Sequence, residues 1–222
     1  MSSVAESDSL QAWIAHVFDH PVTEPAWYWS LEAPKWRGSA ENVATFVAET
    51  FEHSGELLSR FTDAQLNQAF WYLTSPGSSN FMFALVEPAV PLATRLRALR
   101  SFVPLFEQVM AVRCSSHLSH LDEQPAKPLN GACYMWWDNL PIYGKPEEPE
   151  REEFDAEVLR VLSRILSIPH DACRESALHG VGERHCHYPN VEVLVDQFLA
   201  YTQNLRPELV FYAIRAKFGM VQ

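Results

Sequence analysis

The C-terminal third of the chain constrains the fold most, because its apolar residues recur at the spacing of an α-helix. The clearest run fits the i, i+3, i+4, i+7, i+8 pattern with Val191, Leu194, Val195, Phe198 and Leu199. Asp171 and Asn190 can cap two helices, Pro207 can open another, and Gly219 is a natural stop. Four helices of about 13–17 residues with short connections predict two stacked antiparallel hairpins over residues 151–222.

The preceding residues, an N-terminal stretch up to residue 38 and an irregular helical half over residues 39–150, also carry helix signals, although less regularly. Asp8-x-x-Gln11 and Thr62-x-x-Gln65 are capping-box patterns, and Ser39 stands before an apolar-periodic run. Residues 91–113 predict a long helix that Pro104 should kink or split. Because no segment shows the alternation of a strand, we expect an all-α fold.

A proline-rich and aromatic segment separates the first predicted helix from the rest. Residues 21–38 contain Pro21, Pro25 and Pro34 together with four aromatic residues, Trp27, Tyr28, Trp29 and Trp36. Because proline breaks helices, we expect an irregular strap laid over the helices. The predicted organisation is a single domain over residues 1–222, with an N-terminal helix and strap up to residue 38.

Charge restricts the class of partner. The formal net charge is −11, and residues 147–157 contain seven acidic residues and one basic residue. Nucleic-acid binding requires clustered Lys and Arg, so we expect no direct nucleic-acid partner. The charge favours a basic protein as partner, and solubility alone is the open alternative. We also expect a cytoplasmic protein, because the sequence shows no apolar span of membrane length and no signal peptide.

The pattern of paired helices over residues 151–219 resembles HEAT and armadillo repeats, whose units run about 40 residues. Arg174, Ala177, Leu178 and Gly180 are similar to the small-residue pattern on the second helix of a HEAT unit. The resemblance implies a degenerate stack of helical hairpins that binds proteins on one face. The whole chain also resembles a group of uncharacterised bacterial proteins that pair a WWD-x-x-P segment with an ESALHG helix, which implies a bacterial origin and no particular activity.

Residues 172–188, ACRESALHGVGERHCHY, are rich in groups that could bind metal or exchange protons. On one helix these groups scatter around the cylinder, and the H-E-x-x-H pattern is absent. His179, Glu183 and Cys186 could still cooperate, but a zinc site needs further ligands. We therefore interpret the stretch as a packing helix whose Ala and Gly residues allow close approach.

A second group of possible ligands lies in residues 114–122, CSSHLSHLD. C-x2-H-x2-H is not a standard zinc pattern, so these histidines are more typical of side chains that cap neighbouring helices. If this loop meets His179 in space, a metal-dependent hydrolase becomes the alternative function. Its ligands would be drawn from Cys114, His117, His120, His179 and His185.

The aromatic residues of the chain can fill its core or anchor an interface. We expect most of them in the core. Of the neighbours Trp136 and Trp137, which must point in different directions on a helix, we expect at most one deep in the core. A small-ligand site beside Trp136 is a third hypothesis.

These patterns favour a non-enzymatic protein-binding module that uses no cofactor and binds a basic partner. One specific version is an immunity protein that neutralises a basic bacterial toxin from a type VI or contact-dependent system. The expected partner-binding residues are Glu147, Glu148, Glu152, Glu153, Trp136 and Trp137.

Overall fold

The computed structural model describes residues 9–145, 147–184, 188 and 191–221, and within these ranges it contains helices and no strand. The all-α prediction is therefore confirmed for this part of the chain. The α-helices are α1 (Leu10–Phe18), α2 (Ala40–Glu52), α3 (Ser54–Leu57), α4 (Asp63–Thr74), α5 (Leu92–Arg100), α6 (Phe102–Leu105), α7 (Ala111–Arg113), α8 (Leu129–Tyr134), α9 (Glu152–Leu166), α10 (Asp171–Arg184), α11 (Val191–Tyr201) and α12 (Pro207–Ala216). No helix in these ranges has the length and apolar character needed to cross a membrane.

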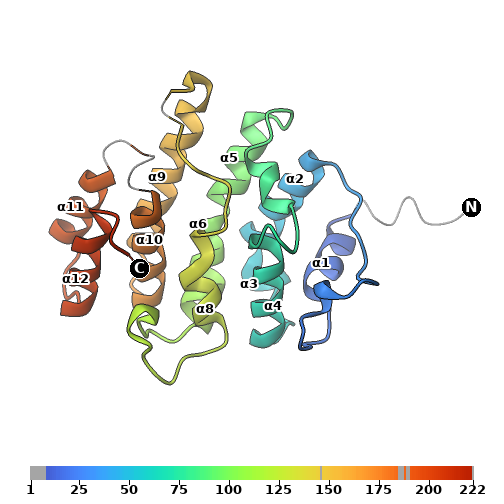
Figure 1. Cartoon of the computed structure of the whole chain (residues 1–222), viewed down its shortest axis with the longest axis horizontal. Coiled ribbons are helices and arrows are strands. Elements are labelled where there is room, and N and C mark those ends of the chain that lie inside the picture. Colours follow the sequence, from blue (N-terminus) through green and yellow to red (C-terminus); the bar gives the residue numbers. More distant parts are fainter. Residues whose placement is uncertain (1–8, 146, 185–187, 189–190, 222) are drawn as a thin grey trace, which may run out of the picture.

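The helices form two packed rows (Figure 1). In one row α2 packs on α5, α5 on α9 and α9 on α11, and in the other α1, α4, α8, α10 and α12 follow one another. The rows contact each other through pairs such as α9 with α10 and α11 with α12. Their buried apolar side chains form one cluster that runs from α1 to α12.

Local capping signals explain where several helices begin and end. Thr62 and Gln65 form the predicted capping box at the start of α4, and the Ser39 side chain caps α2. Pro207 opens α12, and Gly219 adopts the left-handed conformation with φ of 70°. Each of these signals acts within one turn of chain, which is why the sequence alone reveals it.

Two other predicted caps differ from the structure. The cap of α1 is Ser9, one residue after the predicted position, and its Oγ accepts a hydrogen bond from the backbone N–H of Ala12. Asp171 is the first residue of α10 and not its cap, and the preceding carbonyl of His170 accepts the first helical hydrogen bonds. Both starts are displaced by one residue, an ordinary error for helix boundaries. The cap predicted at Asn190 lies outside the described residues.

The helix predicted over residues 91–113 is split, as Pro104 indicates. It divides into α5, α6, a wider π-helical turn at Phe106–Met110, and α7. Pro104 has no N–H to donate to the carbonyl of Arg100, four residues back, so the helix is interrupted between α5 and α6.

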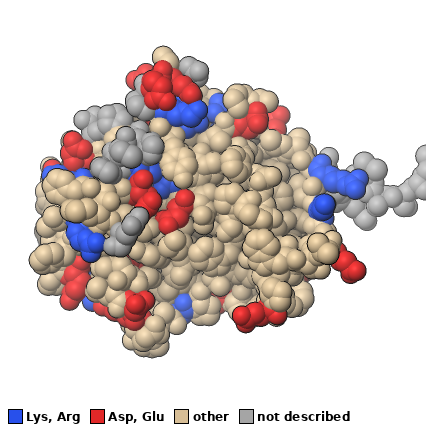
Figure 2. All heavy atoms as spheres, in the orientation of Figure 1, with Lys and Arg blue, Asp and Glu red and all other residues tan. Residues whose placement is uncertain are grey.

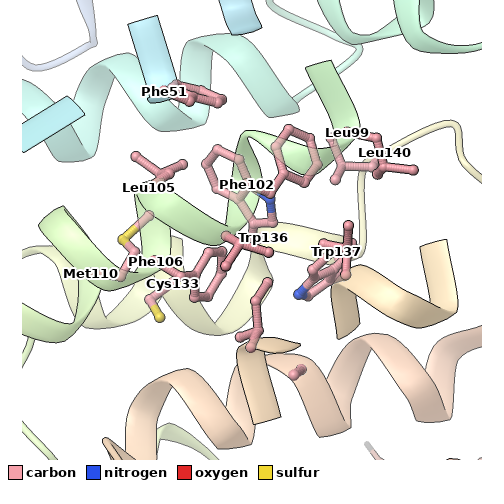
Figure 3. Close-up of a cluster of buried hydrophobic side chains, with 14 of the residues drawn as sticks. Phe51, Leu99, Phe102, Leu105, Phe106, Met110, Cys133, Trp136, Trp137 and Leu140 are labelled. Carbon is pink, nitrogen blue, oxygen red and sulfur yellow. The ribbon is translucent and has the colours of Figure 1, made fainter. Parts of the chain in front are cut away.

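Both Trp136 and Trp137 are buried, with exposed fractions of 1% and 0%, so the expectation that at most one lies in the core is wrong. They lie on a 3₁₀ turn, η5 (Met135–Trp137), which contacts α8 and α10. The Trp136 ring packs 5.6 Å from Phe70 and 5.5 Å from Phe102, while the Trp137 ring lies 5.9 Å from Phe102. Figure 3 shows both tryptophans beside Phe102. Protein surrounds the turn on more than one side, so both rings find apolar contacts.

Candidate functional site: a buried histidine–carboxylate cluster and an aromatic cavity

The two segments rich in possible ligands meet at α10, and Glu175 joins them. Its carboxylate is completely buried and accepts hydrogen bonds from the backbone N–H groups of Ser119 and His120, at 2.8 and 2.9 Å. It also lies 2.6 Å from Nδ1 of the His120 ring. Because a buried carboxylate without partners is costly, these three donors tie the 114–122 loop to α10.

A tyrosine from α12 lies between the two histidines. The Tyr212 ring stacks on His120 with 4.2 Å between ring centroids, and its hydroxyl forms a 2.7 Å hydrogen bond with Nδ1 of His179. On the far side of the His179 ring, Nε2 lies 2.8 Å from Oδ1 of Asp138, outside hydrogen-bond geometry. Burial raises the pKa of Tyr212, so its hydroxyl stays neutral. We call Asp138, Glu175, His120, His179 and Tyr212 the polar cluster.

The structure places the predicted metal ligands apart. His120 and His179 contact different atoms of Tyr212. His117 lies near Glu123 instead. Hydrogen bonds from Arg206 and from the backbone N–H of Leu118 lower the pKa of Glu123 most, and His117 lowers it further. Cys114 lies with buried Cys133, and this neighbouring thiol and then burial raise the pKa of Cys114.

A protonated thiol is a poor metal ligand. Within the described ranges no group of three or more His, Cys, Asp and Glu side chains is placed to hold a metal ion. His185, the remaining predicted ligand, and Cys186 lie outside these ranges, and Glu183 on α10 is not part of the polar cluster.

The WWD and ESALHG segments also meet in space. A Cβ atom added to Gly180 would lie 2.5 Å from Cγ of Trp137, so only glycine fits beneath this ring. Ser176 donates a hydrogen bond to the carbonyl of Cys133. Arg184 is buried at the end of α10 and donates to the carbonyls of Trp137 and Leu140. These contacts make the two segments one packing unit, which agrees with the interpretation of α10 as a packing helix.

Three of the seven acidic residues of the acidic segment, residues 147–157, pair with neighbouring cations. Glu157 pairs with Arg100 and Arg160, Asp155 with Arg151, and Glu148 with Lys145. In Figure 2 the Asp and Glu side chains at the end where α9 begins lie next to Lys and Arg, and the middle of this face carries few charges.

Three of the predicted contact residues remain exposed: Glu147, Glu152 and Glu153. Trp136 and Trp137, by contrast, are too deeply buried to touch a partner. The two tryptophans are therefore corrected to core residues.

A hollow lies beside residues 21–38, where the sequence predicted no site; this strap is irregular, as expected, apart from a short 3₁₀ turn at Trp27–Trp29. It has a volume of about 580 Å³ and lies between the strap, α2, α4 and the 3₁₀ helix η2 (Phe81–Leu85). We call it the strap cavity. Aromatic side chains from three of these elements line it, namely Tyr28, Trp36, Tyr72, Phe81 and Phe83. The aromatic residues and prolines of residues 21–38 were its sequence signal, but the residues of α4 and η2 join them only in the folded chain.

The rings around the strap cavity hold one another in place. Tyr28 stacks on Tyr72 with centroids 5.2 Å apart, and Trp36 meets Trp13 edge to face at 5.4 Å. Behind them, Nε2 of His16 forms a 3.1 Å hydrogen bond with the Tyr72 hydroxyl. Burial, and then the neighbouring His20, lower the pKa of His16 to about 4, so this imidazole is neutral at pH 7. The aromatic part of the cavity wall is therefore neutral, and Ser30, Ser78, Ser79 and Asn80 add polar groups to the lining.

Comparison with known proteins assigns the chain to no family: no family model matches it, and no curated protein or solved structure does either.

Proposed function

We propose that the chain is a non-enzymatic binding module of HEAT-like stacked helical hairpins, whose partner is a basic protein. The specific form we favour is an immunity protein of the bacterial cytoplasm that neutralises a basic toxin of a type VI or contact-dependent system. A large negative net charge speeds association with a basic partner and makes the encounter sensitive to salt.

The observation that carries this proposal is a hollow of about 440 Å³ beside the first turn of α9. Glu152 and Glu153 line it together with Leu92, Pro149, Ala156 and Arg160, and the charge of Arg160 is already paired with Glu157. Both glutamates are exposed and form no ion pair within the described residues. A long basic side chain of a partner could lay its methylene groups on the apolar lining and bring its charge to these carboxylates.

Co-purification tests the proposal. The tagged protein is expressed in its source bacterium, and its bound proteins are compared with those of a variant in which Glu147, Glu148, Glu152 and Glu153 are changed to Gln. A control variant changes Glu24, Glu32, Glu41 and Glu56 to Gln, because these four are also exposed and their loss gives the same net charge.

The expected result is a basic protein that the wild type and the control retain and the α9 variant loses. Equal recovery by both variants would show that the acidic segment is not the contact surface. Recovery of the wild-type protein with no basic partner would count against the proposal as a whole.

The alternative expected from the sequence, a metal-dependent hydrolase, receives no specific support from the described residues. Elemental analysis of protein purified without a histidine tag is the measurement that would revive it.

A further inference from the structure

The strap cavity has the size and preorganisation of a small-molecule site. Its volume of about 580 Å³ lies within the range of roughly 300–1,000 Å³ that small-ligand pockets occupy. The Tyr28 and Trp36 rings are already fixed by their contacts with Tyr72 and Trp13. A ligand that enters therefore orders few side chains, which reduces the entropic cost of binding.

The mouth of the cavity carries exposed apolar side chains. Leu31 is fully exposed and Phe83 is 45% exposed, and both line the cavity. Exposed apolar side chains grouped at the mouth of a hollow indicate a binding site more often than single ones do. Together with the rings inside, they favour a ligand with an apolar, flat body.

Charge at the rim indicates the polar end of the ligand. Lys35 lines the cavity, and within the described part of the chain its ammonium group forms no ion pair. The other charged lining residue, Glu87, lies near the guanidinium group of Arg95, so its negative charge has a cationic neighbour, and it also accepts a hydrogen bond from the backbone N–H of Ala89 at 3.2 Å. The unpaired charge of the rim is therefore positive, although the chain as a whole is strongly negative.

We propose that the strap cavity binds a small organic anion with an aromatic body, of which an arylacetate is the simplest form. Its ring lies against the aromatic walls, and its carboxylate faces Lys35. This inference is independent of the proposed protein partner, because no residue of α9 lines the strap cavity.

Titration calorimetry with indole-3-acetate and phenylacetate tests the proposal directly. Three comparison probes each change one property of the ligand. Tryptamine carries a positive charge on the indole ring, indole carries no charge, and octanoate carries its carboxylate on an aliphatic chain. We expect saturable binding of both arylacetates and weaker binding of all three comparison probes. The absence of saturable binding by the arylacetates at millimolar concentration would overturn the proposal.

Two matched pairs of variants locate the site. Lys35→Gln should weaken indole-3-acetate binding at least about fivefold, the effect of losing about 1 kcal/mol of exposed charge pairing. Arg37→Gln removes the same charge two residues away, outside the cavity lining, and should leave affinity unchanged. Phe83→Ala should weaken binding, whereas Phe211→Ala removes an exposed ring from α12 and should not.

Three outcomes contradict the assignment. Equal effects of Lys35→Gln and Arg37→Gln would place the anion elsewhere, and tryptamine binding as tight as indole-3-acetate would exclude an anion site. Octanoate binding tighter than the arylacetates would exclude an aromatic body. Thermal unfolding of each variant checks that it is folded, and all four substitutions are at exposed positions.

Discussion

The polar cluster and the strap cavity differ in how much space their side chains leave open. The cluster contains two histidines and two carboxylates, and although Nε2 of His179 and Oδ1 of Asp138 form no hydrogen bond, three donors surround Glu175 and one tyrosine fills the space between the histidines. The strap cavity has few acid or base groups, yet it leaves open space, exposed apolar side chains and an unpaired ammonium group. A ligand site is thus indicated by open space beside accessible groups more than by the density of reactive residue types.

The largest expected effect comes from removing Glu175. Glu175→Ala leaves two buried backbone N–H groups and the His120 ring without their acceptor, so the free energy of unfolding should fall by about 3–5 kcal/mol. Urea unfolding measures this change. Glu152→Ala, at an exposed position, is the control and should change stability by less than about 0.5 kcal/mol. A similar small loss for both variants would mean that the cluster does not stabilise the fold.

Two glycine substitutions, one in α10 and one in α8, test how tightly α10 is packed. Gly180→Ala forces Trp137 to move and should cost about 1–3 kcal/mol. Gly131→Ala in α8 meets no atom within 4 Å and should stabilise the protein by up to about 1 kcal/mol, because alanine is the better helix former. Urea midpoints of the two variants should therefore shift in opposite directions. Shifts in the same direction would contradict the packing described for α10.

His16 gives the strap region a dependence of stability on pH. Its pKa is about 4 in the folded protein and about 6.5 in the unfolded chain, so the unfolded state binds more protons between these values. Stability should be highest above pH 6.5 and fall as the pH drops towards 4. Allowing for the partial exposure of the ring, the loss between pH 7 and pH 5 should be about 1 kcal/mol.

His16→Phe keeps an aromatic ring but removes the titrating group, so it should reduce this loss. The comparison needs urea midpoints at pH 7 and pH 5 for both proteins. His170, whose pKa is also lowered by burial, will leave a residual pH dependence in the variant. An unchanged pH dependence in His16→Phe would show that this ring is not the source.

The smallest effect is expected at the mouth of the strap cavity. Leu31→Ser exchanges a fully exposed apolar side chain for a polar one, so the free energy of unfolding should change by less than about 0.5 kcal/mol. Phe83→Ser removes a half-buried ring and should lower it by about 1 kcal/mol. Urea unfolding is again the measurement. A loss above about 1 kcal/mol for Leu31→Ser would mean that this side chain supports the fold, and it would weaken its interpretation as part of a binding rim.

Sequence reasoning was most accurate where a signal and its effect lie within one helical turn. The capping box at Thr62, the opening of α12 at Pro207 and the split near Pro104 all belong to this class. The contact of His120 with Glu175 spans 55 residues, and that of His16 with Tyr72 spans 56. Because such contacts depend on how the rows of helices pack, no local pattern specifies them.

The fate of the two tryptophans illustrates the same limit. The sequence shows that Trp136 and Trp137 point in different directions. Only the packing of η5 against α8 and α10 shows that both rings are buried among apolar side chains. The acidic segment is a second case. Its composition is visible in the sequence, but the pairing of Glu157 with Arg100 depends on α5 lying beside α9.

The contact of Trp137 with Gly180 has a consequence for fragments of this chain. A protease that cuts after exposed Glu147 separates this tryptophan from α10 in sequence but not in space. Glu175 would still hold His120, and Arg206 would still hold Glu123 across the cut. The two pieces should remain associated, and when expressed as separate polypeptides they should reassemble by fragment complementation.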